Sequence, residues 1–122
     1  MSEHILVVDG DQISRLILRH MLAELGYETS EAYDVASAVH ALTQDQHYAV
    51  ISDLLLPDGT GLDVLDALGA LPDPPPFVLV TDVAERDDST DRRLREVPFY
   101  LTKPVSTAEL ESSLLSMVRV NS

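Results

Sequence analysis

The chain has 122 residues, 45% of them apolar, and it carries a formal net charge of −13. This length and apolar content suffice for one domain with its own core. The acidic excess argues against direct binding of nucleic acid, because phosphate backbones are held by patches of Lys and Arg. Cysteine is absent, which excludes disulfides and thiolate metal sites, and no segment approaches the roughly 18 apolar residues of a membrane span. We therefore expect a soluble, cytoplasmic protein without a membrane segment.

Short apolar runs predict five strands that alternate with helices. The predicted strands cover residues 5–9, 28–32, 48–53, 77–81 and 99–102. The second of these is polar, so we expect it at an edge of the sheet. Short connections between the strands and helices indicate a parallel sheet with right-handed crossovers and helices on both faces. The proline-rich stretch 71–76 is predicted to be a stiff loop before the fourth strand.

The helices are predicted from apolar residues that recur at a spacing of 3.6. The first helix is expected to stop at Gly26. Its predicted apolar stripe consists of Ile13, Leu16, Ile17, Met21 and Leu25. Asp34 is the expected N-cap of the second helix. The predicted inward-facing residues of the second and third helices are Ala36, Val39 and Leu42, then Leu62, Leu65 and Leu68.

The last two predicted helices differ in character. The fourth, about residues 84–96, is mostly charged, so we expect a solvated and loosely held helix. The fifth begins with a capping-box pattern from Ser106 to Glu109. Its apolar face is predicted to include Leu110, Leu114 and Met117.

Polar residues lie at the carboxyl ends of four of the predicted strands, where three end the strand and the fourth follows it. They are Asp9, Asp53, Thr81 and Lys103. Ligands of such a sheet bind beyond the carboxyl ends of the strands, so we expect these groups to converge there. Phosphoryl transfer needs an acceptor oxygen, a divalent cation, a fixed positive charge and a hydroxyl donor. Asp53 would supply the acceptor and, with Asp9, a site for Mg²⁺. Lys103 would supply the positive charge and Thr81 the hydroxyl.

Four motifs follow one another along the chain. They are ILVVDGD from residue 5, DLLLPDGTG from residue 53, VT at residues 80–81 and YLTKP from residue 100. In this order and spacing they resemble the receiver domains of two-component response regulators. The resemblance implies one receiver domain over residues 1–122. The implied fold is a three-layer, flavodoxin-like (βα)5 domain of the α/β class, with a parallel five-stranded sheet in the order 2-1-3-4-5.

The resemblance also implies a role for individual residues. Asp53 would accept a phosphoryl group from a phosphohistidine on a histidine kinase or histidine phosphotransfer protein. Asp9 and the backbone carbonyl of Leu55 would join Asp53 as ligands of Mg²⁺. Lys103 would contact the phosphoryl group, and the Lys103–Pro104 bond is expected to be cis.

Thr81 and Tyr100 would form the switch of such a domain. On phosphorylation the hydroxyl moves toward the phosphoryl group and the ring turns inward. This reshapes the face made by the fourth helix, fifth strand and fifth helix, which would bind a downstream effector. A second copy of the chain is a further candidate partner. A domain of this kind is not an enzyme beyond self-catalysed phosphoryl transfer and autodephosphorylation.

The chain departs from the family pattern around the acidic pocket. Gly10 stands where receivers have the acid that ligates the metal directly, so we expect weakened Mg²⁺ binding. Asp11 or Asp82 is a candidate replacement, although Asp11 can instead cap the first helix. Asp82 replaces a small residue and would narrow the access of a phosphodonor. Leu55 and Val83, both apolar, occupy the positions that tune loss of the phosphoryl group, which predicts slow hydrolysis.

Two other functions stay open. Gly10 and Asp82 favour a pseudo-receiver, which keeps the fold as an interaction module that does not depend on phosphorylation. Asp9 and Asp11 also imitate the first motif of haloacid-dehalogenase-type phosphatases, an Asp nucleophile followed two residues later by an Asp general acid. That phosphatase would need a further acidic pair after the lysine, and it would leave Asp53 without a role.

Overall fold

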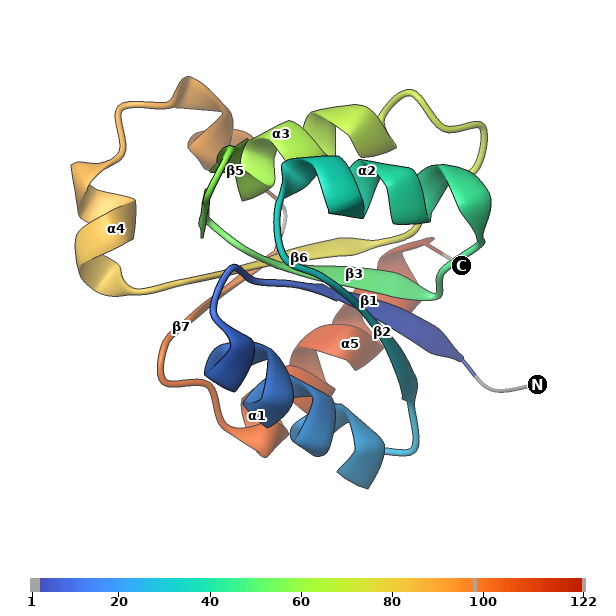
Figure 1. The fold of residues 1–122 in the computed structure, drawn as a ribbon. Coiled ribbons are helices and arrows are strands. Elements are labelled where there is room, and N and C mark those ends of the chain that lie inside the picture. Colours follow the sequence, from blue (N-terminus) through green and yellow to red (C-terminus); the bar gives the residue numbers. More distant parts are fainter. Residues whose placement is uncertain (1–2, 98, 122) are drawn as a thin grey trace.

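Five parallel strands form the central sheet of the computed structural model, which describes residues 3–97 and 99–121 (Figure 1). They are β1 (His4–Val8), β2 (Glu28–Ala32), β3 (Ala49–Asp53), β6 (Phe77–Thr81) and β7 (Tyr100–Thr102). The order β2-β1-β3-β6-β7 is the predicted 2-1-3-4-5 order. The two extra strands, β4 (Leu55–Leu56) and β5 (Gly59–Thr60), form a separate antiparallel hairpin. Each predicted strand boundary lies within one residue of the observed one.

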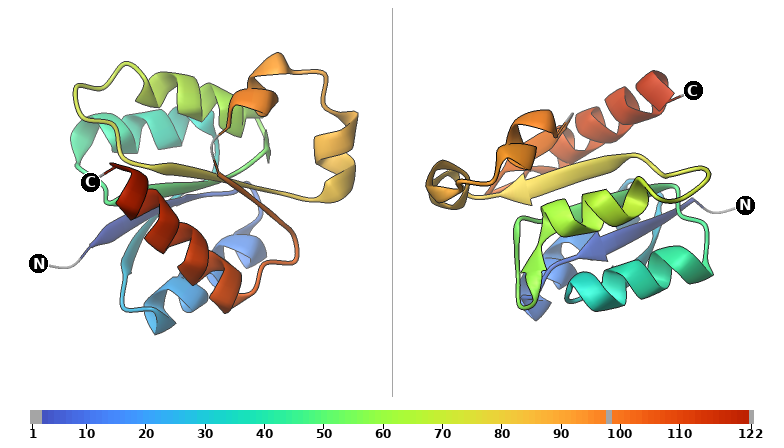
Figure 2. Two further views of the ribbon diagram at one scale, coloured as in Figure 1. Left: turned by 180° about the vertical axis from the view of Figure 1, so that it is seen from behind. Right: turned by 90° about the horizontal axis from the view of Figure 1, so that it is seen from above.

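Helices cover both faces of the sheet (Figures 1 and 2). One face carries α1 (Gln12–Glu24) and α5 (Thr107–Asn121), and the other carries α2 (Val35–Gln44) and α3 (Gly61–Leu68). The chain after β6 forms α4 (Val83–Asp88) and a 3-10 helix, η1 (Arg92–Glu96). Among the described helices, none has both the length and the apolar content needed to cross a membrane.

Two apolar cores lie on opposite faces of the sheet because alternate strand residues point to opposite sides. In β1, Leu6 and Val8 pack toward α2 and α3. Ile5 and Val7 pack toward α1 and α5. The strands of the inner sheet are therefore buried on both faces, which explains their continuous apolar sequence.

The predicted apolar stripe of α1 is wrong in its rotation. Leu18 and Leu22 are 7% and 0% exposed, whereas Ile13, Leu16 and Ile17 are 67%, 60% and 51% exposed. The helix carries two neighbouring apolar stripes, and periodicity does not choose which of them faces the sheet. Packing against β1, β3 and α5 buries Leu18 and Leu22, and Met21 and Leu25 of the predicted stripe pack against the same core. The prediction is therefore wrong for Ile13, Leu16 and Ile17 and holds for Met21 and Leu25.

The inward faces of the next two helices are only partly as predicted. In α2 the buried residues are Ala38 and Leu42, while Ala36 is exposed and Val39 is half-buried. In α3 the prediction holds for the buried Leu62 and Leu68, and Leu65 packs against the same core. The predicted N-cap of α2 is confirmed, since the Asp34 carboxylate accepts a hydrogen bond from the Ser37 backbone N–H at 2.7 Å.

The predicted single helix over residues 84–96 is wrong. Helix α4 ends at Asp88, and η1 begins four residues later. The Ser89 hydroxyl accepts from the Asp91 backbone N–H, and the Asp91 carboxylate accepts from that of Arg93. Such local side-chain bonds compete with the helical ladder and start a new turn. The segment is also not loosely held, because Leu94 packs against the α2–α3 core.

Two predicted helix boundaries are confirmed. Gly26 follows α1 with φ of 93°, a left-handed conformation that favours glycine. At the start of α5 the Ser106 hydroxyl accepts from the Glu109 backbone N–H at 3.1 Å, and the Glu109 carboxylate accepts from the Ser106 backbone N–H at 3.4 Å. This is the reciprocal capping box that the sequence predicts. Leu110, Leu114 and Met117 are all buried.

Candidate functional site

The strand register places two aspartates side by side at the carboxyl edge of the sheet. Val8 of β1 pairs with Ser52 of β3, and each is followed by an aspartate. Asp9 is 2% exposed and Asp53 is 8% exposed. Two nearly buried carboxylates at one place concentrate negative charge, which must be balanced by a cation.

Lys103 supplies a positive charge to both carboxylates. Its Nζ atom lies 3.3 Å from Asp53 Oδ2 and 3.7 Å from Asp9 Oδ2. The lysine follows β7, and its backbone N–H donates to the Thr81 carbonyl at 2.9 Å. The expected cis Lys103–Pro104 bond is confirmed. The structure thus brings together the four polar residues that the sequence places at the carboxyl ends of its strands.

The two oxygens of Asp9 differ in their surroundings. Oδ1 accepts a hydrogen bond from the Asp11 backbone N–H at 2.8 Å. Oδ2 is buried and accepts no hydrogen bond from the residues that the structure describes. A buried anionic oxygen without a donor is costly unless a cation approaches it. Mg²⁺ prefers carboxylate oxygens and retains several of its waters, so the edge formed by Asp9 and Asp53 fits this ion.

The described residues bring no third acid to this pair. Over residues 3–97 and 99–121, no group of three His, Cys, Asp or Glu side chains lies close enough to hold a metal ion. Asp11 caps α1 instead: it accepts from the Ser14 hydroxyl at 2.9 Å and from the Ser14 backbone N–H at 3.2 Å. These bonds, the hydroxyl first, hold the pKa of Asp11 below its ordinary value. Asp82 lies half-buried between β6 and α4.

A short loop carries the chain from Asp53 to α3. We call residues 54–60, which include β4 and β5, the acceptor loop. The Leu54 backbone N–H donates to Asp53 Oδ1 at 2.9 Å, and Gly61 N–H donates to the Leu54 carbonyl at 2.8 Å. A Cβ on Gly61 would lie 2.4 Å from the Asp53 carbonyl oxygen and 2.8 Å from Leu79. Glycine is therefore required where α3 meets β3. Leu55, the expected carbonyl ligand, lies within this loop.

The two expected switch residues lie on adjacent strands. Thr81 is fully buried, and its hydroxyl donates to the Asp82 carbonyl at 3.1 Å. Tyr100 is 50% exposed. The guanidinium carbon of Arg86 lies 5.4 Å from the centre of the Tyr100 ring, which is within the range of a cation–π contact. Arg86 of α4 thus covers a tyrosine whose ring reaches the surface.

Two features near the site are not predicted from the sequence. Arg15 Nη1 donates to the Asp9 carbonyl at 2.7 Å and so supports the chain after β1, yet no motif marks it. A cavity of about 480 Å³ opens beside Asp9 and Lys103, and Ile17 and Met21 of α1 line part of it. The shape of this cavity depends on how α1 is rotated against the sheet, and the periodicity of the sequence does not predict that rotation correctly.

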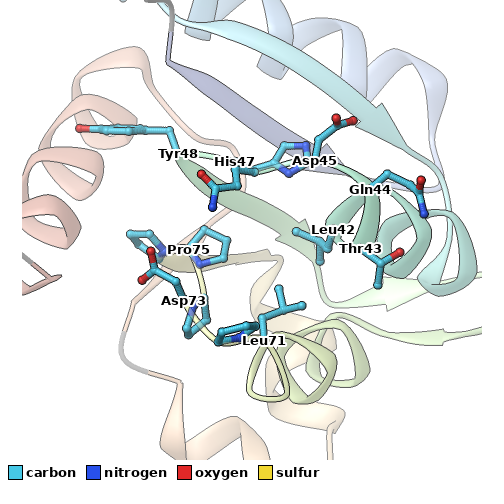
Figure 3. A pocket seen from close by; sticks show the side chains of 13 residues that line it. Leu42, Thr43, Gln44, Asp45, His47, Tyr48, Leu71, Asp73 and Pro75 are labelled. Carbon is cyan, nitrogen blue, oxygen red and sulfur yellow. The ribbon is translucent and has the colours of Figure 1, made fainter.

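A second cavity lies at the opposite end of the strands, where β3 and β6 begin. It measures about 680 Å³ and is lined by residues 42–48 and 71–76, which precede β3 and β6 (Figure 3). His47 contributes to its wall, and burial lowers the pKa of this imidazole. None of the four convergent polar residues lines this cavity. It is therefore separate from the candidate site.

The family follows from a comparison with known proteins. The model of the response regulator receiver domain matches residues 5–115. The chain belongs to the response regulator receiver family. This receiver domain is 32% identical over 122 residues to response regulator MprA of Mycobacterium tuberculosis, a match that covers 98% of the chain and 52% of the relative. The chain thus spans about half the length of the response regulators that it matches.

Solved structures agree with the fold of this receiver domain. A CheY-like receiver domain from Methylobacillus flagellatus has a TM-score of 0.85 and 31% identity, over 96% of this chain and 99% of that one. A receiver domain of a sensor histidine kinase from Pseudomonas aeruginosa has a TM-score of 0.84 and 24% identity, over 98% and 99% of the two chains. That second structure holds a magnesium ion coordinated in its active site cleft. The predicted flavodoxin-like fold is confirmed, and receiver domains are signalling domains.

Proposed function

We propose that this receiver domain is a phosphorylation-dependent switch with Asp53 as its phosphoacceptor. The observation that carries the proposal is the contact of Lys103 Nζ with Asp53 Oδ2 at 3.3 Å, beside the second buried carboxylate of Asp9. A fixed cation next to an acceptor oxygen is what phosphoryl transfer requires. The donor would be a phosphohistidine on a histidine kinase or a histidine phosphotransfer protein.

The two carboxylate oxygens of Asp53 make different contacts. Oδ1 accepts from the Leu54 backbone N–H, and Oδ2 faces Lys103. We assign Oδ2 to attack on phosphorus. A bond forms between this oxygen and phosphorus, the bond from phosphorus to the donor's imidazole nitrogen breaks, and its electron pair stays on that nitrogen. Lys103 is then placed to bind the transferred phosphoryl oxygens.

Mg²⁺, when bound, would neutralise the charge of the phosphoryl oxygens. Asp9 and Asp53 would hold it through their carboxylates, and Leu55 through its backbone carbonyl. Gly10 offers no carboxylate, so the affinity is expected to be lower than in receivers with two adjacent acids. Asp11 and Asp82 are the candidate replacements.

Thr81 and Tyr100 would carry the signal away from Asp53. The Thr81 hydroxyl would leave the Asp82 carbonyl for the phosphoryl group, and the Tyr100 ring would turn inward and away from Arg86. The affected face consists of α4, β7 and α5, where an effector or a second copy of the chain would bind. We further propose a cytoplasmic location and no direct contact with nucleic acid or membrane, because the chain is strongly acidic and lacks cysteine.

A second candidate function is a pseudo-receiver that binds partners without phosphorylation. The specific observation in its favour is that, in the part of the chain that the structure describes, no third acidic side chain joins Asp9 and Asp53 closely enough to hold a metal. Asp82 adds a negative charge near the entry of a donor. The retained contact of Lys103 with Asp53 favours the phosphoacceptor over this alternative.

The deciding experiment is an intact-mass measurement after incubation with Mg²⁺ and acetyl phosphate. One phosphoryl group on the wild type and none on Asp53→Ala is the expected result. If the wild type gains no mass, and a panel of histidine kinases also fails to label it, the pseudo-receiver becomes the better description.

A further inference from the structure

Arg93 of η1 binds three carboxylates at once. Its Nε and Nη2 atoms pair with Asp91 at 3.0 Å and 2.5 Å. Its Nη1 atom donates to Asp63 at 3.0 Å and to Asp66 at 2.5 Å. Asp63 and Asp66 belong to α3, so the pairs cross from one element to another, and both views show η1 beside α3 (Figure 2). An arginine with several short ionic contacts holds its segment more firmly than one surface pair does.

Asp63 connects this cluster to the acceptor loop. One carboxylate oxygen, Oδ1, accepts from Arg93, and the other, Oδ2, accepts from the Thr60 backbone N–H at 2.9 Å. The loop also lies close against this side chain, because a Cβ on Gly59 would come within 2.5 Å of Asp63 Oδ2. Asp66 also accepts from Arg93, but among the residues that the structure describes it forms no hydrogen bond with the acceptor loop. Of the two aspartates of α3 that bind Arg93, Asp63 alone also bonds to the acceptor loop, as the N3 residue of the capping box that starts α3.

The acceptor loop leads directly to the proposed phosphoacceptor. Thr60 is followed by Gly61, whose N–H donates to the Leu54 carbonyl, and the Leu54 N–H donates to Asp53 Oδ1. The loop is also fixed on its other side, since the Asp58 carboxylate accepts two backbone N–H bonds at the start of α2, at 2.7 Å and 3.1 Å. Hydrogen bonds, joined by the backbone of Leu54 and of Thr60–Gly61, thus connect the Asp53 carboxylate to the Arg93 guanidinium.

We propose that Arg93 is a positioning residue that acts through Asp63 to hold the acceptor loop and to couple it to η1. The state of Asp53 would then reach η1 by a route that does not include Thr81 or Tyr100. The signalling part of this inference rests on the proposed phosphorylation of Asp53, whereas the hold on the loop belongs to the unmodified domain. Coupling between two sites is reciprocal, so releasing Arg93 alters the loop and modifying Asp53 alters η1.

The first test measures amide hydrogen exchange in the unmodified protein. The described hydrogen bonds of the Arg93 side chain go to Asp91, Asp63 and Asp66 and not to the acceptor loop, yet Arg93→Gln is expected to speed exchange at Thr60 by about fivefold. Asp63→Ala should do the same, and the matched control Asp66→Ala should not. Core amides of β1 report global stability in every variant. Unchanged exchange at Thr60 in Arg93→Gln, equal acceleration in Asp66→Ala, or parallel acceleration in β1 would each overturn the proposal.

The second test follows η1 after phosphorylation with Mg²⁺ and acetyl phosphate. The exchange rate of the Leu94 amide is expected to change in the wild type and in Tyr100→Ala, but not in Asp63→Ala. A response that Tyr100→Ala abolishes would show that η1 is reached through the switch residues instead. If intact mass shows no phosphoryl group at all, the proposed function fails, and the exchange at Thr60 still decides whether Arg93 holds the loop.

Discussion

Lys103 Nζ lies 3.3 Å from Asp53 Oδ2, so the positive charge already contacts the proposed acceptor oxygen in the unmodified domain. The same Nζ lies 3.7 Å from Asp9 Oδ2. One positive charge thus faces two nearly buried carboxylates. A bound divalent cation would neutralise the negative charge that remains. The charges at this edge of the sheet therefore influence Mg²⁺ affinity, the rate of phosphorylation and the stability of the domain. Substitutions of single charged residues should change these three properties to different extents.

Lys103→Gln should abolish efficient phosphorylation without weakening metal binding. Removing one preorganised group that stabilises a developing anion reduces rates by about 100-fold or more. The two carboxylates would lose their cation, so Mg²⁺ should bind at least as tightly as in the wild type. The checks are the rate of mass gain with acetyl phosphate and a titration with Mg²⁺. Arg19→Gln, which removes an exposed cation paired with Glu31, is the control. An unimpaired rate in Lys103→Gln would contradict the assigned role.

Gly10→Asp should strengthen Mg²⁺ binding by about tenfold, because it adds a carboxylate beside Asp9. The added Cβ would lie 3.1 Å from Pro57 Cδ and 3.4 Å from Pro57 Cγ, so the proline ring must yield by a few tenths of an ångström. Gly10→Asn has nearly the same shape without the charge and controls for this crowding. Titration with Mg²⁺ measures the effect. Equal affinities in the Asp and Asn variants would show that Gly10 does not limit the site.

Asp11→Ala and Asp82→Ala test whether another acid replaces the missing one. If Asp11 only caps α1, its substitution should destabilise the domain and leave Mg²⁺ affinity unchanged. If Asp82 completes the metal site, its substitution should weaken Mg²⁺ by about tenfold or more. Each variant needs a metal titration and a urea unfolding curve. Unchanged Mg²⁺ affinity in both variants would dispose of the idea of a replacement ligand.

Leu55→Asn should shorten the lifetime of the phosphorylated state. Leu55 follows Asp53 by two positions and is 52% exposed, so its substitution should cost little stability. A polar side chain there can orient an attacking water, which contributes at least about tenfold where geometry permits. Leu55→Met keeps the side chain apolar and should keep the slow loss expected of the wild type. The measurement is the decay of the phosphorylated mass after removal of the donor. Rapid decay in the wild type itself would refute the predicted slow hydrolysis.

Acid should destabilise the domain partly through its helix cap at Asp34. Hydrogen bonds from the Ser37 hydroxyl and then its backbone N–H hold the pKa of Asp34 below the ordinary 3.8. A carboxyl with a lowered folded-state pKa stabilises fully above its unfolded-state pKa, and this stabilisation is lost as pH falls through the folded-state pKa. Asp34→Asn still caps the helix but does not titrate. Its free energy of unfolding should therefore fall less than that of the wild type between about pH 5 and pH 2. Identical slopes of stability against pH would contradict this.

The sequence by itself determined the sheet and the polar residues at its carboxyl edge. Short continuous apolar runs are local patterns that mark the buried strands, and parallel strands end at a common edge. The sequence alone therefore predicts that Asp9, Asp53, Thr81 and Lys103 lie close together. The capping box at Ser106 was predictable for the same reason, since its bonds span only three residues.

The tertiary structure alone decided which stripe of α1 faces the core and how the segment after β6 folds. Leu18 and Ile17 are adjacent and similarly apolar, and only contact with the sheet and α5 buries the first and exposes the second. Arg93 meets Asp63 and Asp66 across 30 and 27 residues of sequence. Such contacts between distant segments depend on the whole packed fold, and no local spacing in the chain encodes them.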